Sequence, residues 1–536
     1  VGGQTTNRME KVEVESGLEY NSCLVFINLL QNINKYQKGK KFCNWKDGDL
    51  AVALNHLILL EEKKEKLRTT SRTWTKAAAT GNMGLIGWLS AQNYEGCTTE
   101  VMDHAAAHNQ LKTVEWLHRN RTEGCSSTAM DLAAHQGHFE MIEWLHKNRL
   151  EGCSPKAIEY ACKRGDLSMV EWLHCNQRET SYSELAMDKA AFSGNIQLLK
   201  WLDRNLGAEC CSMNSIVLAS KGGHPHVLEY LKRNKREQYI DAMHYLEGNA
   251  ILAAAKAGNL SVLEWMLMEP GDVLSSFGAI NWASEKGHLH VVEWLYAKYE
   301  PLLPTERALA RAAENGHLKL VEWVHGLPAR PNGTAPGAFS ALTLDRAAKG
   351  GQLRVVEWLH THRTEGCTTQ AMDLAARGGH LSTVEWLHTH RAEGCTRAAL
   401  NGAASFGHLH VLQWLQRHRP EQCTLTASVE AARNGHLEVL DWIHIHNPEC
   451  VAPELVRAAS HQGHLEVVEW AFAPGHLPDP SWVRENQSTL VGWALRAAAT
   501  GDQPHITEWV AQTFPHLHQE IMGQILLEKR SASSNI

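Results

Sequence analysis

The sequence lacks the features that mark membrane, secreted and nucleic-acid-binding proteins. It has no apolar run long enough to span a bilayer. No signal peptide and no basic amphipathic targeting segment is recognisable in it. The formal charge of −7 is small for 536 residues, and it argues against nucleic-acid binding by simple electrostatics. We therefore expect an intracellular, cytoplasmic protein with no membrane partner and no nucleic-acid partner.

The motifs of the large enzyme classes are also missing. The sequence has no G-x-G-x-x-G, no G-x-x-x-x-G-K-[ST], no H-E-x-x-H and no G-x-S-x-G. Its Asp and His residues recur at fixed places in many similar segments, which is typical of structural positions and not of catalytic ones. We expect no enzyme activity, no catalytic residue and no cofactor.

The thirteen cysteines and 32 histidines do not predict disulfides or a metal site. If the repeated segments are packed helices, equivalent residues lie about 8–10 Å apart. Disulfides need Cα separations below about 7 Å, and zinc ligands bind at about 2 Å. We therefore expect buried thiols in a reducing compartment and structural or exposed histidines. Seven cysteines share one place in the repeat: Cys97, Cys125, Cys153, Cys210, Cys367, Cys395 and Cys423.

What the sequence does contain is a long internal repeat. "RTEGCSSTAMDLAAHQGHFEMIEWLHKNR" at 121–149 returns as "RTEGCTTQAMDLAARGGHLSTVEWLHTHR" at 363–391. The aromatic residue of "EWL" marks fifteen units, most of them 28 or 29 residues apart. The markers are Trp88, Trp116, Trp144, Trp172, Trp201, Tyr230, Trp265, Trp294, Trp323, Trp358, Trp386, Trp414, Trp442, Trp470 and Trp509.

Each unit is predicted to form two short helices. The first follows a Ser or Thr that can cap it, and ends at "AAxxG". The glycine column, which holds Asn109 in one unit, indicates a left-handed C-cap. The next position is always His, Asn, Asp or Gln, which we expect to bond the local backbone where the second helix begins. The second helix carries an apolar stripe, and the Trp column is predicted to be buried core.

The segment "AARGGHLSTVEWL" resembles the centre of the ankyrin repeat, A-A-x-x-G-H-x-x-V-V-x-x-L-L. The resemblance extends over residues 73–512, and the wording of the units is similar to short ankyrin arrays of oomycetes and giant viruses. Ankyrin repeats usually run about 33 residues and include a β-turn segment. Here Asp373 stands where the family has His, and about five residues of the hairpin are absent. The resemblance implies an all-α, ankyrin-like α-solenoid of about 15 stacked helix pairs, with the β-hairpins mostly missing.

The segments outside the repeat define the predicted domain organisation. Residues 1–72 are expected to form a helical N-terminal cap region, because the end units of a solenoid need a polar outer face. Residues 73–512 form the array, and 513–536 a C-terminal helix and tail. Loop insertions are predicted at 232–245, 326–341 and 471–493.

By resemblance, the chain is expected to be a non-catalytic scaffold or adaptor that binds a protein on the concave face made by the first helices. A structural subunit or spacer of a larger assembly, and a regulatory part of a multidomain enzyme, are the alternatives. Fifteen units would extend over roughly 120–150 Å. Nothing in the sequence indicates the partner or the oligomeric state.

The candidate binding residues lie at the end of the first helix. The two variable positions of "AAxxG" hold eight basic residues but only Glu285 and Glu314 as acidic ones. This column predicts an acidic protein or peptide partner, although cations also stabilise helix C-termini through the macrodipole. The candidates are Lys163, Arg164, Lys221, Lys256, Lys286, Lys349, Arg377 and Arg433, the aromatic Phe192 and Phe406 of the same columns, and Tyr160, Trp282 and Arg311 of a neighbouring variable column.

Overall fold

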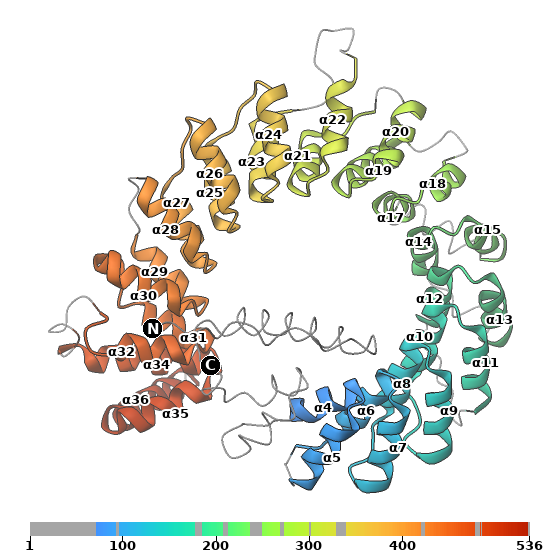
Figure 1. The fold of residues 1–536 in the computed structure, drawn as a ribbon, viewed down its shortest axis with the longest axis horizontal. Coiled ribbons are helices and arrows are strands. Elements are labelled where there is room, and N and C mark those ends of the chain that lie inside the picture. Colours follow the sequence, from blue (N-terminus) through green and yellow to red (C-terminus); the bar gives the residue numbers. More distant parts are fainter. Residues whose placement is uncertain are drawn as a thin grey trace, which may run out of the picture. The chain divides into compact units, whose positions relative to one another are not determined.

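The computed structural model describes residues 71–92, 96–176, 185–206, 213–235, 249–267, 273–299, 302–328, 339–419, 424–477, 483 and 485–533. Within these ranges the chain is all α-helical, with one short 3-10 turn (Pro448–Cys450) and no strand. The described helices form fifteen consecutive pairs and one further helix at the end (Figure 1). The predicted all-α solenoid of about fifteen helix pairs is confirmed.

The chain divides into two compact units, and the division falls within the sixth pair. The first unit ends at Ala219 and also takes in His226–Tyr239, and the second holds Ser220–Pro225 and Ile240–Ile536. The first six pairs are α4 (Ser71–Thr80) and α5 (Met83–Ala91), α6 (Thr99–Ala107) and α7 (Leu111–Asn120), α8 (Ser127–Gln136) and α9 (Phe139–Asn148), α10 (Pro155–Arg164) and α11 (Leu167–Asn176), α12 (Leu185–Ser193) and α13 (Ile196–Leu206), and α14 (Met213–Gly222) and α15 (Pro225–Asn234).

The other nine pairs follow in the same order. They are α17 (Asn249–Ala257) and α18 (Leu260–Met266), α19 (Val273–Glu285) and α20 (Leu289–Lys298), α21 (Glu306–Glu314) and α22 (Leu318–Gly326), α23 (Ala341–Lys349) and α24 (Leu353–His362), α25 (Thr369–Arg377) and α26 (Leu381–His390), α27 (Arg397–Ser405) and α28 (Leu409–His418), α29 (Leu425–Arg433) and α30 (Leu437–His446), α31 (Leu455–Gln462) and α32 (Leu465–Phe472), and α34 (Gln487–Thr500) and α35 (Pro504–Thr513).

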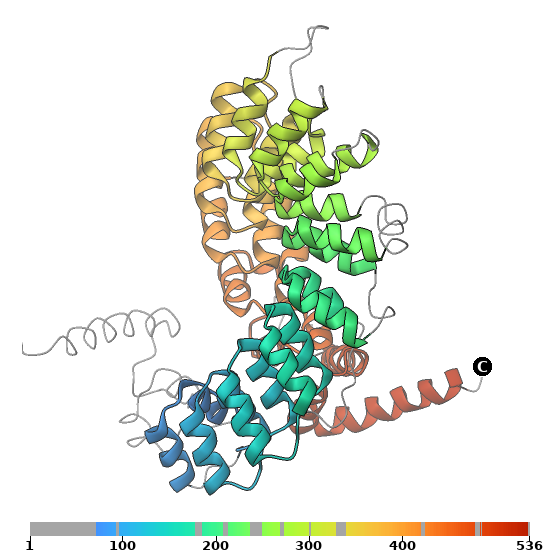
Figure 2. The ribbon, with the colours of Figure 1, turned by 90° about the vertical axis from the view of Figure 1, so that its right-hand side faces the viewer.

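Within each of the two compact units, the first helices of the pairs form one layer and the second helices form another (Figures 1 and 2). Neighbouring first helices make far more extensive contacts than neighbouring second helices do. The paired alanines explain this closeness, because Ala375 and Ala376 are fully buried and their small side chains let the backbones approach. The core lies between the two layers, where the second helix contributes residues such as Val384 and Leu387.

The glycine column provides the left-handed turn that joins the two helices of a pair. Gly379 has a φ of 76° and Asn109 a φ of 56°, as expected for a C-cap that only Gly or Asn adopts easily. In the last pair the structure corrects our assignment of the left-handed residue. There the left-handed residue is Asp502, with a φ of 54°, while Gly501 has an ordinary φ of −89°.

The prediction that the Trp column is buried core is wrong for most units. Trp386 is half-buried, and only Trp470, at 7% exposed, counts as core. Trp386 follows the buried Val384 by two positions, and residues two apart on a helix do not share a face. It lies between second helices. The ring of His360 from the preceding pair stands perpendicular to it at 5.1 Å, and His390 stacks on it at 4.4 Å, both measured between ring centroids.

The structure describes only some of the segments outside the repeat. Residues 1–70 lie outside the described residues, so the N-terminal cap stays a prediction. At the other end, α36 spans Pro515–Ser533 (Figure 2). Most of the predicted insertions at 232–245 and 326–341 also lies outside the described ranges, although α15 runs on to Asn234.

Candidate interaction surface on the first helices

A buried carboxylate on the first helix ties each of several pairs to the next. Ser126 donates its backbone N–H and its hydroxyl to Asp103, at 2.9 and 2.6 Å, and Ser154 does the same to Asp131. Thr368 and Thr396 bond the acids one repeat earlier in the same way. In these four cases the acid and the hydroxyl residue are 23 positions apart in the sequence. This spacing could have predicted the contact, but our sequence reasoning did not use it.

Burial raises the pKa of three of these carboxyl groups, and the hydrogen bonds that they accept lower it in part. Asp103, Asp131 and Asp345 all have a raised pKa for this reason. An amide takes the same place in two pairs: Asn281 accepts from Thr305 at 2.8 Å, and Asn401 accepts from Thr424 at 2.8 Å. In these pairs the contact requires an acceptor and does not require a charge.

The polar position after the glycine column binds backbone, but in most pairs not where we expected. Asn82 and Asp166 accept from the N–H three residues on, as a local cap does. The histidines make no such cap. The His288 ring instead lies 3.1 Å from the carbonyl oxygen of Lys256, in the preceding pair, and His138 bonds the Ala107 carbonyl in the same manner. The column thus ties neighbouring pairs together, which corrects the prediction of a purely local cap.

The residues of the "RxEGC" motif form a third contact between pairs, on the side of the second helices. Arg391 pairs with Glu393 beside it and reaches back one repeat, to His360 Nδ1 at 3.4 Å and to Cys367. Because a guanidinium only donates, the His360 nitrogen must be unprotonated. Burial raises the pKa of the Cys367 thiol to about 11, so this thiol is unreactive. The residues that recur in the repeat therefore hold neighbouring pairs together.

The candidate binding residues are all exposed or half-buried on the first helices or at their ends. Trp282 is half-buried, with Lys256 Nζ 4.5 Å from its ring centroid. Phe406 is 48% exposed, with Arg377 Cζ 5.0 Å from its ring centroid. The structure thus brings two predicted cations together with two predicted aromatic residues, from adjacent pairs in each case.

Other candidates form ion pairs with nearby carboxylates. Arg311 and Lys286 lie 3.3 and 4.0 Å from Glu285, and Lys349 lies 2.7 Å from Glu314. Arg433 lies 2.6 Å from Glu430 on its own helix. These four cations are partly neutralised, so their charge is less available to a partner than their number in the sequence indicates.

The remaining candidates belong to the fourth, fifth and sixth pairs. Lys163, Arg164 and Lys221 are exposed. The Arg164 guanidinium lies over Gly137, where a side chain would leave it no room. Tyr160 is half-buried, with the His135 ring perpendicular to it at 4.7 Å between ring centroids, and Phe192 is half-buried.

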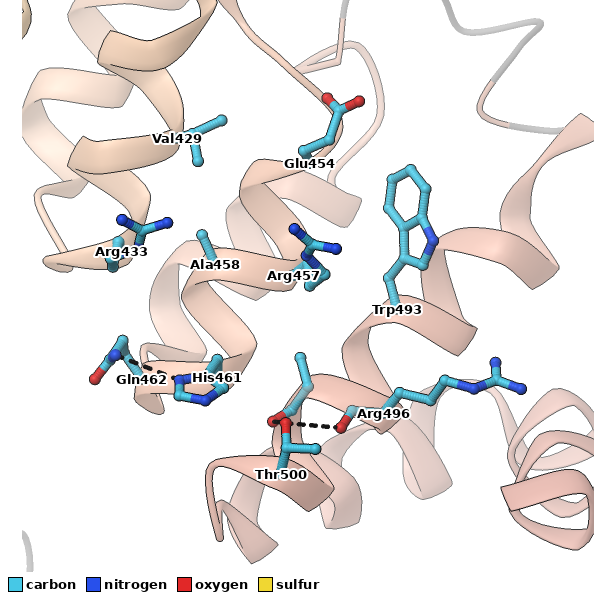
Figure 3. Close-up of a pocket in the computed structure, with 11 residues that line it drawn as sticks. Val429, Arg433, Glu454, Arg457, Ala458, His461, Gln462, Trp493, Arg496 and Thr500 are labelled. Atoms are coloured by element: carbon cyan, nitrogen blue, oxygen red, sulfur yellow. Dashed lines mark hydrogen bonds between the residues drawn. The ribbon is translucent and has the colours of Figure 1, made fainter. Parts of the chain in front are cut away.

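Sequence reasoning missed a hollow at the end of the array (Figure 3). It lies on the first-helix side of α29, α31 and α34 and has a volume of about 560 Å³. Arg457, Trp493 and Arg496 line it together with the predicted Arg433. The signal was present in the alignment of units, because Arg457 and Arg496 occupy the column in which five other units have Asp.

The described part of the chain holds no group of three or more His, Cys, Asp or Glu that could bind a metal ion. None of its helices has the length and apolar character needed to cross a membrane.

Near-identical helix pairs, tied through fixed columns and variable on one exposed side, define a helical repeat protein of the binding or scaffold kind. The chain contains segments that match ankyrin repeats. The family model described as ankyrin repeats (many copies) matches residues 102–146, 153–202, 344–388 and 372–416. A comparison with curated proteins finds no match.

Among solved structures, the chain is similar to the pentatricopeptide repeat protein PPR10 from maize. The TM-score is 0.30 at 11% identity, over 91% of this chain and 83% of that one. A second structure of PPR10, in complex with an 18-nucleotide psaJ RNA element, gives 0.31 at 12% identity, over 93% and 83% of the two chains.

One expectation is corrected by this comparison. Nucleic acid was excluded as a partner from the net charge, yet helical-repeat chains solved with RNA are among the similar structures. Net charge sums the whole chain, whereas a solenoid binds through one face, so the exclusion does not follow from it. A TM-score near 0.3 equally carries no argument that this chain binds RNA.

Proposed function

We propose that this protein is a non-catalytic binding scaffold whose partner is a protein or peptide, held along the exposed side of the first helices. The observation that carries the proposal is that stacking and surface variation are assigned to different positions of the repeat. Fixed columns tie one pair to the next, as in the bonds between Thr368 and Asp345, while the exposed first-helix columns differ from unit to unit.

The exposed columns carry the residue types that dominate protein interfaces. Arg, Trp and other aromatic residues supply much of the binding energy where partners meet. Arg377 beside the half-exposed Phe406 offers a cation and an apolar ring from one spot. A solenoid surface of this kind suits an extended segment or the face of a folded protein.

Affinity purification of the full chain followed by mass spectrometry tests the proposal. One partner recovered in stoichiometric amount would support it, whereas recovery of a large complex would favour a spacer role and recovery of nothing would contradict it. The Arg377→Glu, Phe406→Ala double variant should lose the partner. Arg354→Glu, which reverses an exposed charge on the second helix α24, should keep it and serves as the matched control.

We also propose an intracellular, cytoplasmic location. Support comes from the free thiols of the cysteine column, among them Cys97, Cys125 and Cys367. Such thiols persist in a reducing compartment. Fractionation of cells that make the full chain would test this placement, and recovery from the secreted fraction would contradict it.

A further inference from the structure

The hollow among α29, α31 and α34 combines an apolar floor with cationic walls. Val429, Ala458 and Ala497 lie at its base, and the half-buried Trp493 forms one wall. Figure 3 shows Arg457 in the middle of the group, between Arg433 on α29 and Trp493 on α34. A volume of about 560 Å³ is in the range of hollows that bind small ligands or a few side chains of a peptide.

Within the described residues, the side chain of Arg457 makes no hydrogen bond or ion pair to a neighbouring pair. Arg457 stands thirteen residues before Trp470, the place that Asp373 holds before Trp386, where several other pairs have the carboxylate that accepts from a Ser or Thr. The last pair offers no such donor, because the position equivalent to Thr396 is Val491, which is buried inside α34. At this point of the array both the acid and its donor are absent, and the exposed Arg457 occupies the position of the acid.

The other charges around the hollow are already engaged or directed elsewhere. Arg433 bonds Glu430 at 2.6 Å. Arg496 turns along its own helix toward Gly492. No ion pair of Arg457 occurs within the described residues, and the nearest acid in the lining is Glu454 at the start of α31.

We propose that the hollow is a docking site for a segment of the partner protein that presents an Asp or Glu carboxylate to Arg457. An adjacent apolar side chain of that segment packs on Trp493 and the floor formed by Val429 and Ala497. A guanidinium binds a carboxylate through two parallel hydrogen bonds, and an aromatic wall beside an Arg is typical of an interface hot spot. This inference rests on the proposed scaffold function, and it names the chemistry that one part of the surface recognises.

The local charge favours a carboxylate over a phosphate. One unpaired guanidinium balances one negative charge, whereas Glu454 in the lining would repel a group that carries about two. A nucleic-acid strand would bring repeated phosphates past the same acid. The chemistry of the hollow is therefore that of an acidic peptide side chain.

Peptide arrays probed with the full chain test the inference. Three arrays hold peptides with the central residue fixed as Glu, Gln or phosphoserine and the other positions randomised, and single-stranded poly-U RNA is measured separately. We expect retention on the Glu array about tenfold above the Gln array at low salt, equivalent to about 1.4 kcal/mol. Arg457→Glu should abolish that preference and Arg354→Glu should preserve it, with unchanged melting temperatures for both variants.

Several outcomes would overturn the inference. Equal retention on the Glu and Gln arrays, a preference for phosphoserine or for RNA, or an Arg457→Glu chain that still selects Glu would each exclude a carboxylate site at Arg457. All of these would leave the scaffold function standing if affinity purification recovers a partner. Absence of any retained peptide and of any purified partner would reject both.

Discussion

Thr368 donates both its backbone N–H and its hydroxyl to Asp345, one repeat earlier in the chain, at 2.8 and 2.7 Å. The carboxylate is only 2% exposed. A buried acid is unfavourable unless donors satisfy it, so the bond fixes the position of one first helix against the next. The stack is held in register by this polar contact as well as by its apolar core.

Removing the acceptor should therefore cost more than removing its charge. Asp345→Ala leaves the Thr368 N–H and hydroxyl without their partner, and we expect a loss of roughly 1–3 kcal/mol in the free energy of unfolding. Asp345→Asn should cost less than about 1 kcal/mol, because Asn281 and Asn401 already act as acceptors in other pairs. Chemical denaturation of the full chain measures both. Equal losses for the two variants would show that the hydrogen bonds do not matter.

Stability should fall as the pH drops from 7.5 to 5. Burial lowers the pKa of His317, His408 and His436. The unfolded chain then binds protons at a higher pH than the folded chain, so stability is complete above about pH 6.5 and is lost as the pH falls through the folded pKa. Asp103, Asp131 and Asp345 act in the opposite direction, but in the lower range where carboxylates titrate.

A natural replacement in the same column provides the control for this pH dependence. Gln352 occupies the position of these histidines in the tenth pair. The triple variant His317→Gln, His408→Gln, His436→Gln should show a smaller change of melting temperature between pH 7.5 and 5 than the unmodified chain. A change of the same size in both would mean that these histidines do not cause it.

The left-handed turn at Gly379 should discriminate between side chains. Any Cβ there meets His408 at about 2.6 Å, so both Gly379→Asn and Gly379→Val displace that ring. Only Val adds the strain of a β-branched residue at a φ of 76°. We expect Val to be the more destabilising by at least about 1 kcal/mol. Thermal unfolding that ranks the two variants equally would contradict the cap assignment.

The Trp column should be uneven in its contribution to stability. Trp470 is 7% exposed, and its indole N–H donates to Asp441. Its replacement by Ala should cost roughly 3–5 kcal/mol, as for a large core truncation. Trp386 is half-buried between His360 and His390, and we expect a loss of about 2 kcal/mol on truncation to Ala. A larger loss for Trp386 than for Trp470 would reverse this assignment.

The repetition made the fold predictable. Fifteen copies of one pattern fix the helix pairs, the turn glycines and the paired alanines, because each is a local property of the repeated residues. The Trp column was misassigned for a physical reason: hydrophobicity alone does not reveal that Trp386 turns away from Val384 and meets His360 of the previous pair. Contacts across units depend on the stacking geometry, which periodicity does not specify.

The candidate surface was predictable in position but not in its state of charge. The ion pairs between Lys349 and Glu314, and between Arg311 and Glu285, join residues of neighbouring helices that lie far apart in sequence. The hollow at Arg457 likewise requires three helices to come together. A sequence shows which residues are exceptional within a column, but only the packed helices show which of them remain unpaired.

Hydrogen–deuterium exchange of the full chain, with and without its purified partner, tests the central claim most directly. Amide exchange reports protection element by element, so it separates the two layers of helices. The account predicts that binding slows exchange in the first helices, including α25, α27 and α31, while α24, α26 and α30 change little. Protection confined to the second helices, with none in the first, would contradict it.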